Sequence, residues 1–240
     1  MAIERRKATQ IYFCRNISQN RNQTLMNIAS FIDHTNLNPL AVSADIKQLC
    51  EDALKYNFKA VCVAPYHVKT VTDILGETKV NIATVVGFPF GYATIAPKVE
   101  EIRRAIDDGA YELDVVANLA AIKEGRWNFV QNEIDILTIS CQLHDKIIKV
   151  IIETAVLTSD EIKKMCDICA TVGANFVKTS TGFNGGGATI ETVTMMREYL
   201  PKGIQIKASG GIRTLAEAEA FIAAGATRIG TSAGVLMLQG

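Results

Sequence analysis

Short apolar runs alternate along the chain with longer segments in which apolar residues recur every three or four positions. The first pattern is typical of β-strands and the second of amphipathic α-helices. The run at residues 81–86 is mostly apolar, which indicates a strand that is covered on both faces. We predict strands over residues 28–33, 59–63, 81–86, 111–116, 146–153, 175–178, 204–207 and 228–229.

Signals for the start and the end of helices lie between these strands. Ser43 is suited to be the N-cap of the first helix, and Thr158 with Glu161 three residues later is a capping box. Gly109 and Gly173 each stand between a helix and the next strand, where a left-handed residue is favoured. We predict helices over residues 43–56, 66–75, 95–108, 127–143, 159–172, 190–199 and 215–224.

This regular alternation of strands with helices implies a parallel sheet. Eight strands with short connections fit a single-domain (β/α)8 TIM barrel, of class α/β, within residues 28–240. A doubly wound open sheet is the alternative. No change in composition marks a linker, so we expect residues 1–27 to be an N-terminal extension, either helical or poorly ordered.

Composition and charge narrow the classes of partner. The 240-residue chain has 25 basic and 25 acidic residues, so its charge gives no reason to expect nucleic acid or an anionic membrane as a partner. No apolar run approaches the length of about 18 residues that a membrane span needs. Residues 1–23 are basic and poor in acid, which indicates either a loosely ordered lead-in or a mitochondrial transit peptide.

The six cysteines, at positions 14, 50, 62, 141, 166 and 169, form no disulfide framework for a chain of this size. Cys166 and Cys169 are a CxxC pair, but they lie in a predicted helix, with no second Cys or His pair nearby to complete a zinc site. We therefore expect reduced cysteines, mostly in the core, and a cytoplasmic protein.

Lys178 ends the apolar run of a predicted strand, where a lysine needs a partner or a route to solvent. It either reaches the surface along its aliphatic stem or lies desolvated in a pocket as an amine nucleophile. The three hydroxyl residues 179–181 and the backbone of Gly182 favour the nucleophile, because they can bind an intermediate and a phosphate.

Lys207 has the same setting at the end of the next predicted strand. An amine that titrates near 10.4 needs a drop in its pKa of about 3 units to be nucleophilic at neutral pH. A second cation about 5 Å away supplies roughly 3 kcal/mol at an effective dielectric near 20, and burial can supply the remainder. We therefore expect Lys178 and Lys207 to lie in one site.

Further ionisable groups fall at the strand ends, where the active site of a barrel is found. Because side chains alternate along a strand, Asp114 and Glu112 share a face, and lysines in the barrel interior would be natural partners for Asp114. Four other residues have a structural role as the alternative to a role in the site. Lys149 and Glu153 would form a buried ion network, Cys62 would be a small buried thiol rather than a nucleophile, and His34 would be a hydrogen-bonded core side chain rather than a base.

Glycine-containing segments follow the last three predicted strands, at Gly182, at Gly210–Gly211 and at Gly230–Ser232. Their backbone N–H groups, with a short helix N-terminus behind Ser232, predict an anion site of the kind that often binds phosphate in barrels. Residues 184–187 predict a mobile lid after the sixth strand. No GxGxxG follows a strand and no metal-binding motif is present, so we expect no dinucleotide, no metal and no other cofactor.

Seven motifs together resemble the deoxyribose-phosphate aldolase family in order and spacing, over roughly residues 28–236. Any one of them alone would be weak, but the combination is specific. The motifs are Ile32–Thr35, Val61–Val63, Val86–Gly91, Glu112–Val116, Lys149–Thr154, Val177–Phe183 and Lys207–Thr214.

The resemblance implies a metal-free class I aldolase on a (β/α)8 barrel, a lyase of deoxynucleoside and carbohydrate catabolism. Such an enzyme reversibly splits 2-deoxy-D-ribose 5-phosphate into D-glyceraldehyde 3-phosphate and acetaldehyde through a lysine Schiff base. By motif, Lys178 matches the Schiff-base lysine, Lys207 the neighbour that lowers its pKa, and Asp114 the proton-relay acid. The resemblance also implies a homo-oligomer, a dimer or a tetramer. Matching substrate-binding positions are Asp33, Thr35, Cys62, Lys149, Thr181, Gly182, Gly210, Gly211, Gly230 and Ser232.

Three positions depart from the family pattern. Ala233 stands where many members have a second serine, Asn38 stands in place of the usual lysine, and the chain stops at Gly240 without the C-terminal tyrosine of some members. The last departure leaves the route of the proton open. The alternatives to an aldolase are another sugar-phosphate enzyme, such as an isomerase, whose lysines only bind charge, and a non-catalytic sensor of a sugar phosphate.

Overall fold

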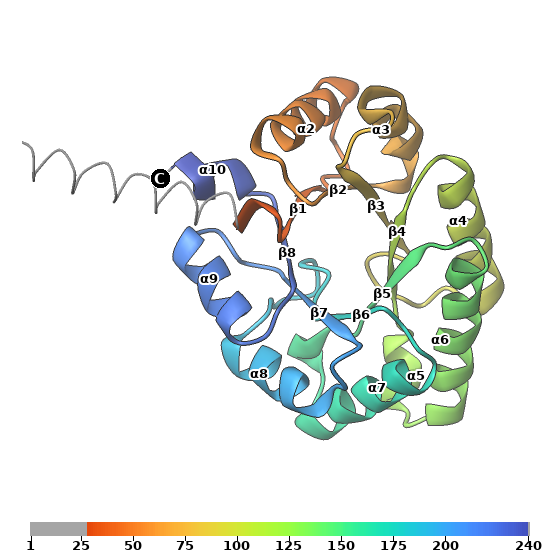
Figure 1. The fold of residues 1–240 in the computed structure, drawn as a ribbon. Coiled ribbons are helices and arrows are strands. Elements are labelled where there is room, and N and C mark those ends of the chain that lie inside the picture. The colour runs from red at the N-terminus through yellow and green to blue at the C-terminus, as the bar shows by residue number, and fades with distance from the viewer. Residues whose placement is uncertain (1–27, 240) are drawn as a thin grey trace, which may run out of the picture.

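Eight parallel strands follow one another in the order of the sequence, and the last strand closes onto the first. The computed structural model describes residues 28–239, so the expectation for residues 1–27 lies outside the described residues (Figure 1). The predicted (β/α)8 barrel is confirmed, and the open-sheet alternative is wrong. The strands are β1 (Ile32–Asn36), β2 (Ala60–Val63), β3 (Asn81–Val86), β4 (Glu112–Val116), β5 (Ile147–Ile151), β6 (Phe176–Lys178), β7 (Gln205–Ser209) and β8 (Arg228–Thr231).

Helices surround the barrel as an outer ring (Figure 1). The seven predicted helices are all present, although the one predicted to start at residue 66 begins with a 3₁₀ turn, Pro65–His67. One short helix, α5, was not predicted, because five residues are too few to show a helical period. The other, α10, is the short helix expected behind Ser232. The helices are α2 (Ser43–Tyr56), α3 (Val68–Leu75), α4 (Ile95–Asp107), α5 (Leu119–Lys123), α6 (Trp127–Gln142), α7 (Ser159–Thr171), α8 (Ile190–Tyr199), α9 (Leu215–Ala223) and α10 (Gly234–Gln239).

The first strand begins four residues later than predicted and ends three residues later. Residues 28–31 form a helical turn closed by the Phe31 N–H donating to the Ile28 carbonyl at 2.9 Å. The turn is tied to the start of β2, because the Lys59 N–H donates to the Ala29 carbonyl at 3.2 Å. Ile28 and Ala29 are apolar because they are buried core residues, not because they lie in a strand.

The helix caps agree with the sequence in one case and not in another. Thr158 and Glu161 form the predicted capping box, with the Thr158 N–H donating to Glu161 Oε2 at 2.7 Å. Ser43 is the first residue of α2 rather than its N-cap. The cap is Val42, whose N–H donates to Asp45 Oδ2 at 2.9 Å. A carboxylate in the first turn has therefore replaced the expected hydroxyl.

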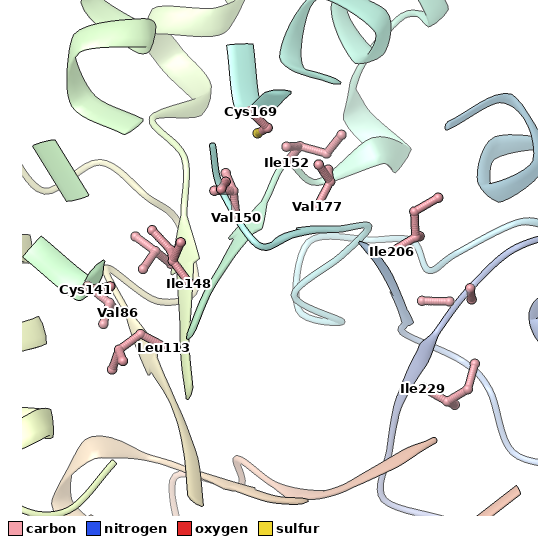
Figure 2. Close-up of a cluster of buried hydrophobic side chains, with 14 of the residues drawn as sticks. Val86, Leu113, Cys141, Ile148, Val150, Ile152, Cys169, Val177, Ile206 and Ile229 are labelled. Carbon is pink, nitrogen blue, oxygen red and sulfur yellow. The ribbon is translucent and has the colours of Figure 1, made fainter. Parts of the chain in front are cut away.

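The hydrophobic core lies between the barrel and the helices. Leu113 and Ile148 point outward from neighbouring strands, and Cys141 of α6 and Cys169 of α7 pack on this layer (Figure 2). The described cysteines are free and buried, as predicted, whereas Cys14 lies outside the described residues. Within residues 28–239 no helix has the length and apolar character needed to cross a membrane. The alternate side chains of the strands face the barrel axis, and many of these are charged.

Candidate active site

Lys178 lies at the floor of a cavity of about 640 Å³ at the C-terminal ends of the strands. Its side chain is almost fully buried, so the alternative in which it extends to the surface is wrong. The parallel register pairs Lys178 of β6 with Lys207 of β7. Two lysines at the same level of adjacent strands point into one site, as the sequence predicted.

Asp114 of β4 holds three lysine amines together. Its Oδ2 atom lies 2.8 Å from Lys178 Nζ and 2.7 Å from Lys207 Nζ, and its Oδ1 atom lies 2.6 Å from Lys149 Nζ. Because one oxygen binds both amines, Lys178 and Lys207 lie close to each other. The carboxylate can therefore exchange protons with either amine without moving.

The ion network continues beneath the cavity through buried side chains. Lys207 Nζ lies 2.5 Å from Asp33 Oδ2, and Lys149 Nζ lies 2.7 Å from Glu112 Oε2. Arg228 of β8 closes the network, with Nη1 at 2.6 Å from Asp33 Oδ1 and 2.8 Å from Glu112 Oε2. Glu112 and Asp114 share the interior face of β4, as strand alternation predicted.

Burial and neighbouring charges move the proton affinities of these groups in different directions. Burial lowers the pKa of Lys178; the carboxylate of Asp114 opposes this, and the charge on Lys207 adds to it. Burial also works against the charge on Lys207, but Asp114 and Asp33 outweigh it and raise the pKa of Lys207. Burial would raise the pKa of Asp33, yet Lys207, Arg228 and Lys149 lower it to about 2. Of the three lysines that bind Asp114, Lys178 is thus the one whose pKa is lowered.

About half of the site residues expected from the sequence line the cavity, among them the glycines after β7 and β8. Asp114 and Lys207 do not line it, but Asp114 contacts Lys178 directly and Lys207 contacts the same oxygen of Asp114. Lys149 is fully buried in the ion network, and Cys62, whose thiol pKa is raised by burial, is fully buried beside Ala83 and Val85. The expected residues that line the cavity are Thr35, Lys178, Thr181, Gly210, Gly211, Gly230 and Ser232.

The loops after β6 and β7 pack against each other through glycine. A Cβ on Gly187 would lie only 2.0 Å from the Gly210 carbonyl oxygen, so no larger residue fits there. Gly210 itself has a φ of +87°, a conformation that residues with a Cβ rarely adopt. The Ala188 N–H then donates to the Ser209 carbonyl at 3.0 Å. These contacts hold one end of the segment 184–187 in place, and its role as a mobile lid stays a prediction.

Glu153 has a position that the sequence did not predict. It lies beyond the end of β5 with a left-handed backbone, φ +58°, and its side chain is fully buried. It does not pair with Lys149. Instead, its carboxylate accepts hydrogen bonds from the hydroxyl and the N–H of Thr181 and from the side-chain amide of Asn184, the last at 3.0 Å. Asn184 also donates to the Pro89 carbonyl at 3.2 Å, which links the loops after β3, β5 and β6.

This arrangement fixes what Thr181 can offer a ligand. A threonine hydroxyl has one proton and two lone pairs. The proton is donated to Glu153, and one lone pair accepts the Phe183 N–H at 3.1 Å. Thr181 can therefore accept one further hydrogen bond from a ligand in the cavity but has no proton left to donate.

Two further residues line the cavity that the sequence did not predict as site residues, Arg213 and His34. Arg213, at the start of the turn into α9, adds a cation beside Gly210 and Gly211. His34 lies on the side toward α2, 4.0 Å from Asp52, and its ring packs on Phe58 at a centroid distance of 4.9 Å. Burial lowers the pKa of His34, although Asp52 opposes this. The Asp-His-Thr motif itself was the signal that could have placed His34 at the rim.

Comparison with known proteins decides the family. The model of the DeoC/LacD family aldolases matches residues 27–240. The chain belongs to this aldolase family. It is 48% identical to the deoxyribose-phosphate aldolase of Thermococcus gammatolerans over 217 residues, and the matched region is 90% of this chain and 96% of that protein. It is 46% identical over 220 residues to the one from Caldanaerobacter subterraneus subsp. tengcongensis, covering 91% and 95%.

Solved structures agree with the assignment to this aldolase family. A putative deoxyribose-phosphate aldolase from Coccidioides immitis superposes with a TM-score of 0.86 at 41% identity, over 90% of this chain and 85% of that one. A tetrameric deoxyribose phosphate aldolase from Aeropyrum pernix superposes with a TM-score of 0.83 at 32% identity, over 94% and 96%. The family resemblance inferred from the seven motifs is confirmed.

Proposed function

We propose that this aldolase reversibly cleaves 2-deoxy-D-ribose 5-phosphate to D-glyceraldehyde 3-phosphate and acetaldehyde, with Lys178 as the Schiff-base lysine. The observation that carries the proposal is the buried Lys178 amine at the floor of the cavity, bound to an oxygen of Asp114 that Lys207 shares. Its lowered pKa supports an amine that is free to attack a carbonyl. A group that only bound charge would instead need a raised pKa, as Lys207 has.

The chemistry follows from this amine. Neutral Lys178 attacks the C1 aldehyde carbon of the open-chain sugar, and loss of water leaves a protonated imine. The imine accepts the electron pair of the C2–C3 bond as that bond breaks, the C3 hydroxyl loses its proton, and glyceraldehyde 3-phosphate departs. The remaining enamine takes up a proton at C2, and water then releases acetaldehyde and restores the amine.

Asp114 is suited to carry the protons of these steps. Lysine neighbours hold its pKa well below the usual range in spite of burial, so it begins as a carboxylate that can accept a proton. It lies within hydrogen-bond distance of both Lys178 and Lys207, the second of which holds a proton firmly. We assign Asp114 the proton-relay role and Lys207 the role of the cation beside it. This route needs no tyrosine from the C-terminus.

The phosphate of the substrate fits the side of the cavity formed after β7 and β8. Backbone N–H groups of small residues and the guanidinium of Arg213 favour a dianion there. We place the phosphate against Gly210, Gly211 and Ser232, with Thr181 near the sugar. Asp33, Cys62 and Lys149 lie deeper than the cavity lining, so we propose that they act on the substrate only through Lys178 and Asp114.

An assay of acetaldehyde release from 2-deoxyribose 5-phosphate tests the proposal. We expect turnover that continues after dialysis against EDTA, because the imine itself is the electron sink. Binding of the sugar phosphate without turnover would favour the sensor. Isomerisation without release of acetaldehyde would favour the isomerase. Within residues 28–239 no group of three or more His, Cys, Asp or Glu side chains could hold a metal ion.

We also propose that the protein is a cytoplasmic homo-oligomer, a dimer or a tetramer, whose catalytic domain is residues 28–240. The tetrameric relative from Aeropyrum pernix supports assembly, and the family match over residues 27–240 supports the domain boundary. Light scattering of the purified protein would test the assembly, since a mass of one chain, 26.1 kDa, would contradict it.

A further inference from the structure

The barrel interior holds a single cluster of charged side chains that extends well beyond Lys178 and Lys207. Ion pairs join its carboxylates to its lysines and its arginine, and the cluster extends from β1 to β8. β3 faces this interior with Ala83 and Val85, which carry no charge. The titratable groups that share the barrel interior with Lys178 are Asp33 of β1, Cys62 of β2, Glu112 and Asp114 of β4, Lys149 of β5, Lys207 of β7 and Arg228 of β8.

These charges balance only when Lys178 is neutral. The three carboxylates Asp33, Glu112 and Asp114 are matched by the three cations Lys149, Lys207 and Arg228. The carboxylates are ionised at neutral pH, because their cationic neighbours outweigh burial and lower each pKa. A proton on Lys178 would add one uncompensated positive charge to a group of side chains that solvent hardly reaches. A net charge in such a place is unfavourable.

Lys207 alone cannot account for a neutral Lys178. Lys207 repels a proton on Lys178, but Asp114, which lies 2.8 Å from that amine, attracts it. Lys207 itself is matched by two carboxylates, at 2.5 and 2.7 Å. The nearest opposite charges therefore offset each other in large part, and burial, the largest cause, lowers the pKa of Lys178. The more distant members of the cluster add to this balance through the net charge of the interior.

We propose that Arg228 and Glu112, which contact neither the cavity nor Lys178, adjust how readily Lys178 holds a proton, because they contribute to the net charge of the barrel interior. Arg228 supplies the third cation and Glu112 the third carboxylate, and they bind each other at 2.8 Å. They are positioning residues of opposite sign. The inference rests on the proposed role of Lys178 as the amine nucleophile.

The two residues give opposite predictions. In Arg228→Met the interior has one positive charge too few, and a proton on Lys178 restores the balance. In Glu112→Gln the interior has one positive charge too many, so Lys178 holds a proton less readily. A unit charge about 10 Å away at an effective dielectric near 20 moves a titration by roughly one pH unit. The double variant loses both charges and should return close to wild type.

The test is the pH dependence of the rate at which acetaldehyde and cyanoborohydride form a reduced adduct on Lys178, located by peptide mass spectrometry. Acetaldehyde is neutral and lacks a phosphate, so the rate does not depend on the phosphate site. We expect the half-point of the profile to rise by roughly one pH unit in Arg228→Met and to fall by about as much in Glu112→Gln. Arg228→Lys keeps the charge and should keep the wild-type profile.

The outcomes separate this inference from the proposed function. A wild-type protein that forms no adduct on Lys178 at any pH overturns both. An adduct on Lys178 with half-points that do not move in opposite directions overturns the charge balance alone, and so does an Arg228→Lys profile that follows Arg228→Met. Thermal melting checks that each variant is folded. Glu112→Gln preserves the shape of the side chain and carries the test if Arg228→Met does not fold.

Discussion

Lys178 and Lys207 are paired across adjacent parallel strands, yet burial and their neighbours drive their proton affinities in opposite directions. Lys178 faces the cavity and has one carboxylate partner, whereas Lys207 lies below it between two carboxylates. Burial lowers the pKa of Lys178. Asp114 and Asp33 overcome burial to raise the pKa of Lys207. This difference supports the proposed roles of Lys178 as the nucleophile and of Lys207 as the cation beside it.

This difference predicts opposite effects on stability when each lysine is replaced by methionine. In the unfolded chain both amines titrate near 10.4. Folding lowers the pKa of Lys178, so the folded protein holds this proton less readily than the unfolded chain, which costs free energy at pH 7. Lys178→Met should therefore raise the melting temperature. Lys207→Met, its matched control, should lower it, because two buried carboxylates lose their partner. Each kcal/mol corresponds to about 2–4 °C in a protein of this size, and a Lys178→Met protein that melts lower than wild type would contradict the proposed neutral amine.

Acid should destabilise the protein through the interior carboxylates. The pKa of Asp33 is lowered to about 2 in the folded state, below its value of about 3.9 in an unfolded chain. Asp33 therefore contributes stability that is present above about pH 4 and is lost as the pH falls toward 2. The pKa values of Glu112 and Asp114 are also lowered, which adds to the effect. Urea unfolding between pH 2 and 7 measures it, and Asp33→Asn should show a shallower loss in acid than wild type.

Ser232→Asp tests the phosphate site. Ser232 lines the cavity beside Gly230, and a carboxylate there would repel the phosphate dianion. We expect KM for 2-deoxyribose 5-phosphate to rise by about tenfold or more, the effect of roughly 1.4 kcal/mol or more of repulsion. Unphosphorylated 2-deoxyribose should be affected much less. Ser232→Asn is the control, because asparagine has nearly the shape of aspartate and no charge. Equal losses in the Asn and Asp variants, or equal losses for the two sugars, would show that the phosphate does not bind beside Ser232.

Glu153→Gln tests the junction of three loops. The carboxylate accepts every hydrogen bond that it makes, from Thr181 and from Asn184, whereas a glutamine amide would turn a donor toward one of these donors. Lost bonds to a charged group cost about 1.5–3 kcal/mol. We expect lower thermal stability and a higher KM, with the pH profile of the lysine unchanged. Glu191→Gln, on the surface of α8, is the control, and a shifted pH profile in Glu153→Gln would mean that Glu153 acts on Lys178 by charge.

The sequence predicted the fold and the proximity of Lys178 and Lys207 because both depend on local patterns. The strand over residues 81–86 matches β3 fully, since an apolar run with clear ends specifies a buried strand. Strand order alone placed Lys178 beside Lys207. The partners of Arg228 could not be predicted, because Asp33 and Glu112 are 195 and 116 residues away in the chain. Glu153 was placed in a strand because nothing in the apolar run before it signals that the backbone turns to a positive φ.

Borohydride reduction in the presence of 2-deoxyribose 5-phosphate tests whether Lys178 forms the Schiff base. We expect one reduced adduct, located by peptide mass spectrometry on Lys178, that is absent in Lys178→Met. In Lys207→Met the adduct should form on Lys178 more slowly at pH 7 and recover at high pH. An adduct on Lys207 in the wild-type protein, or trapping that survives in Lys178→Met at the wild-type yield, would mean that Lys178 is not the Schiff-base lysine.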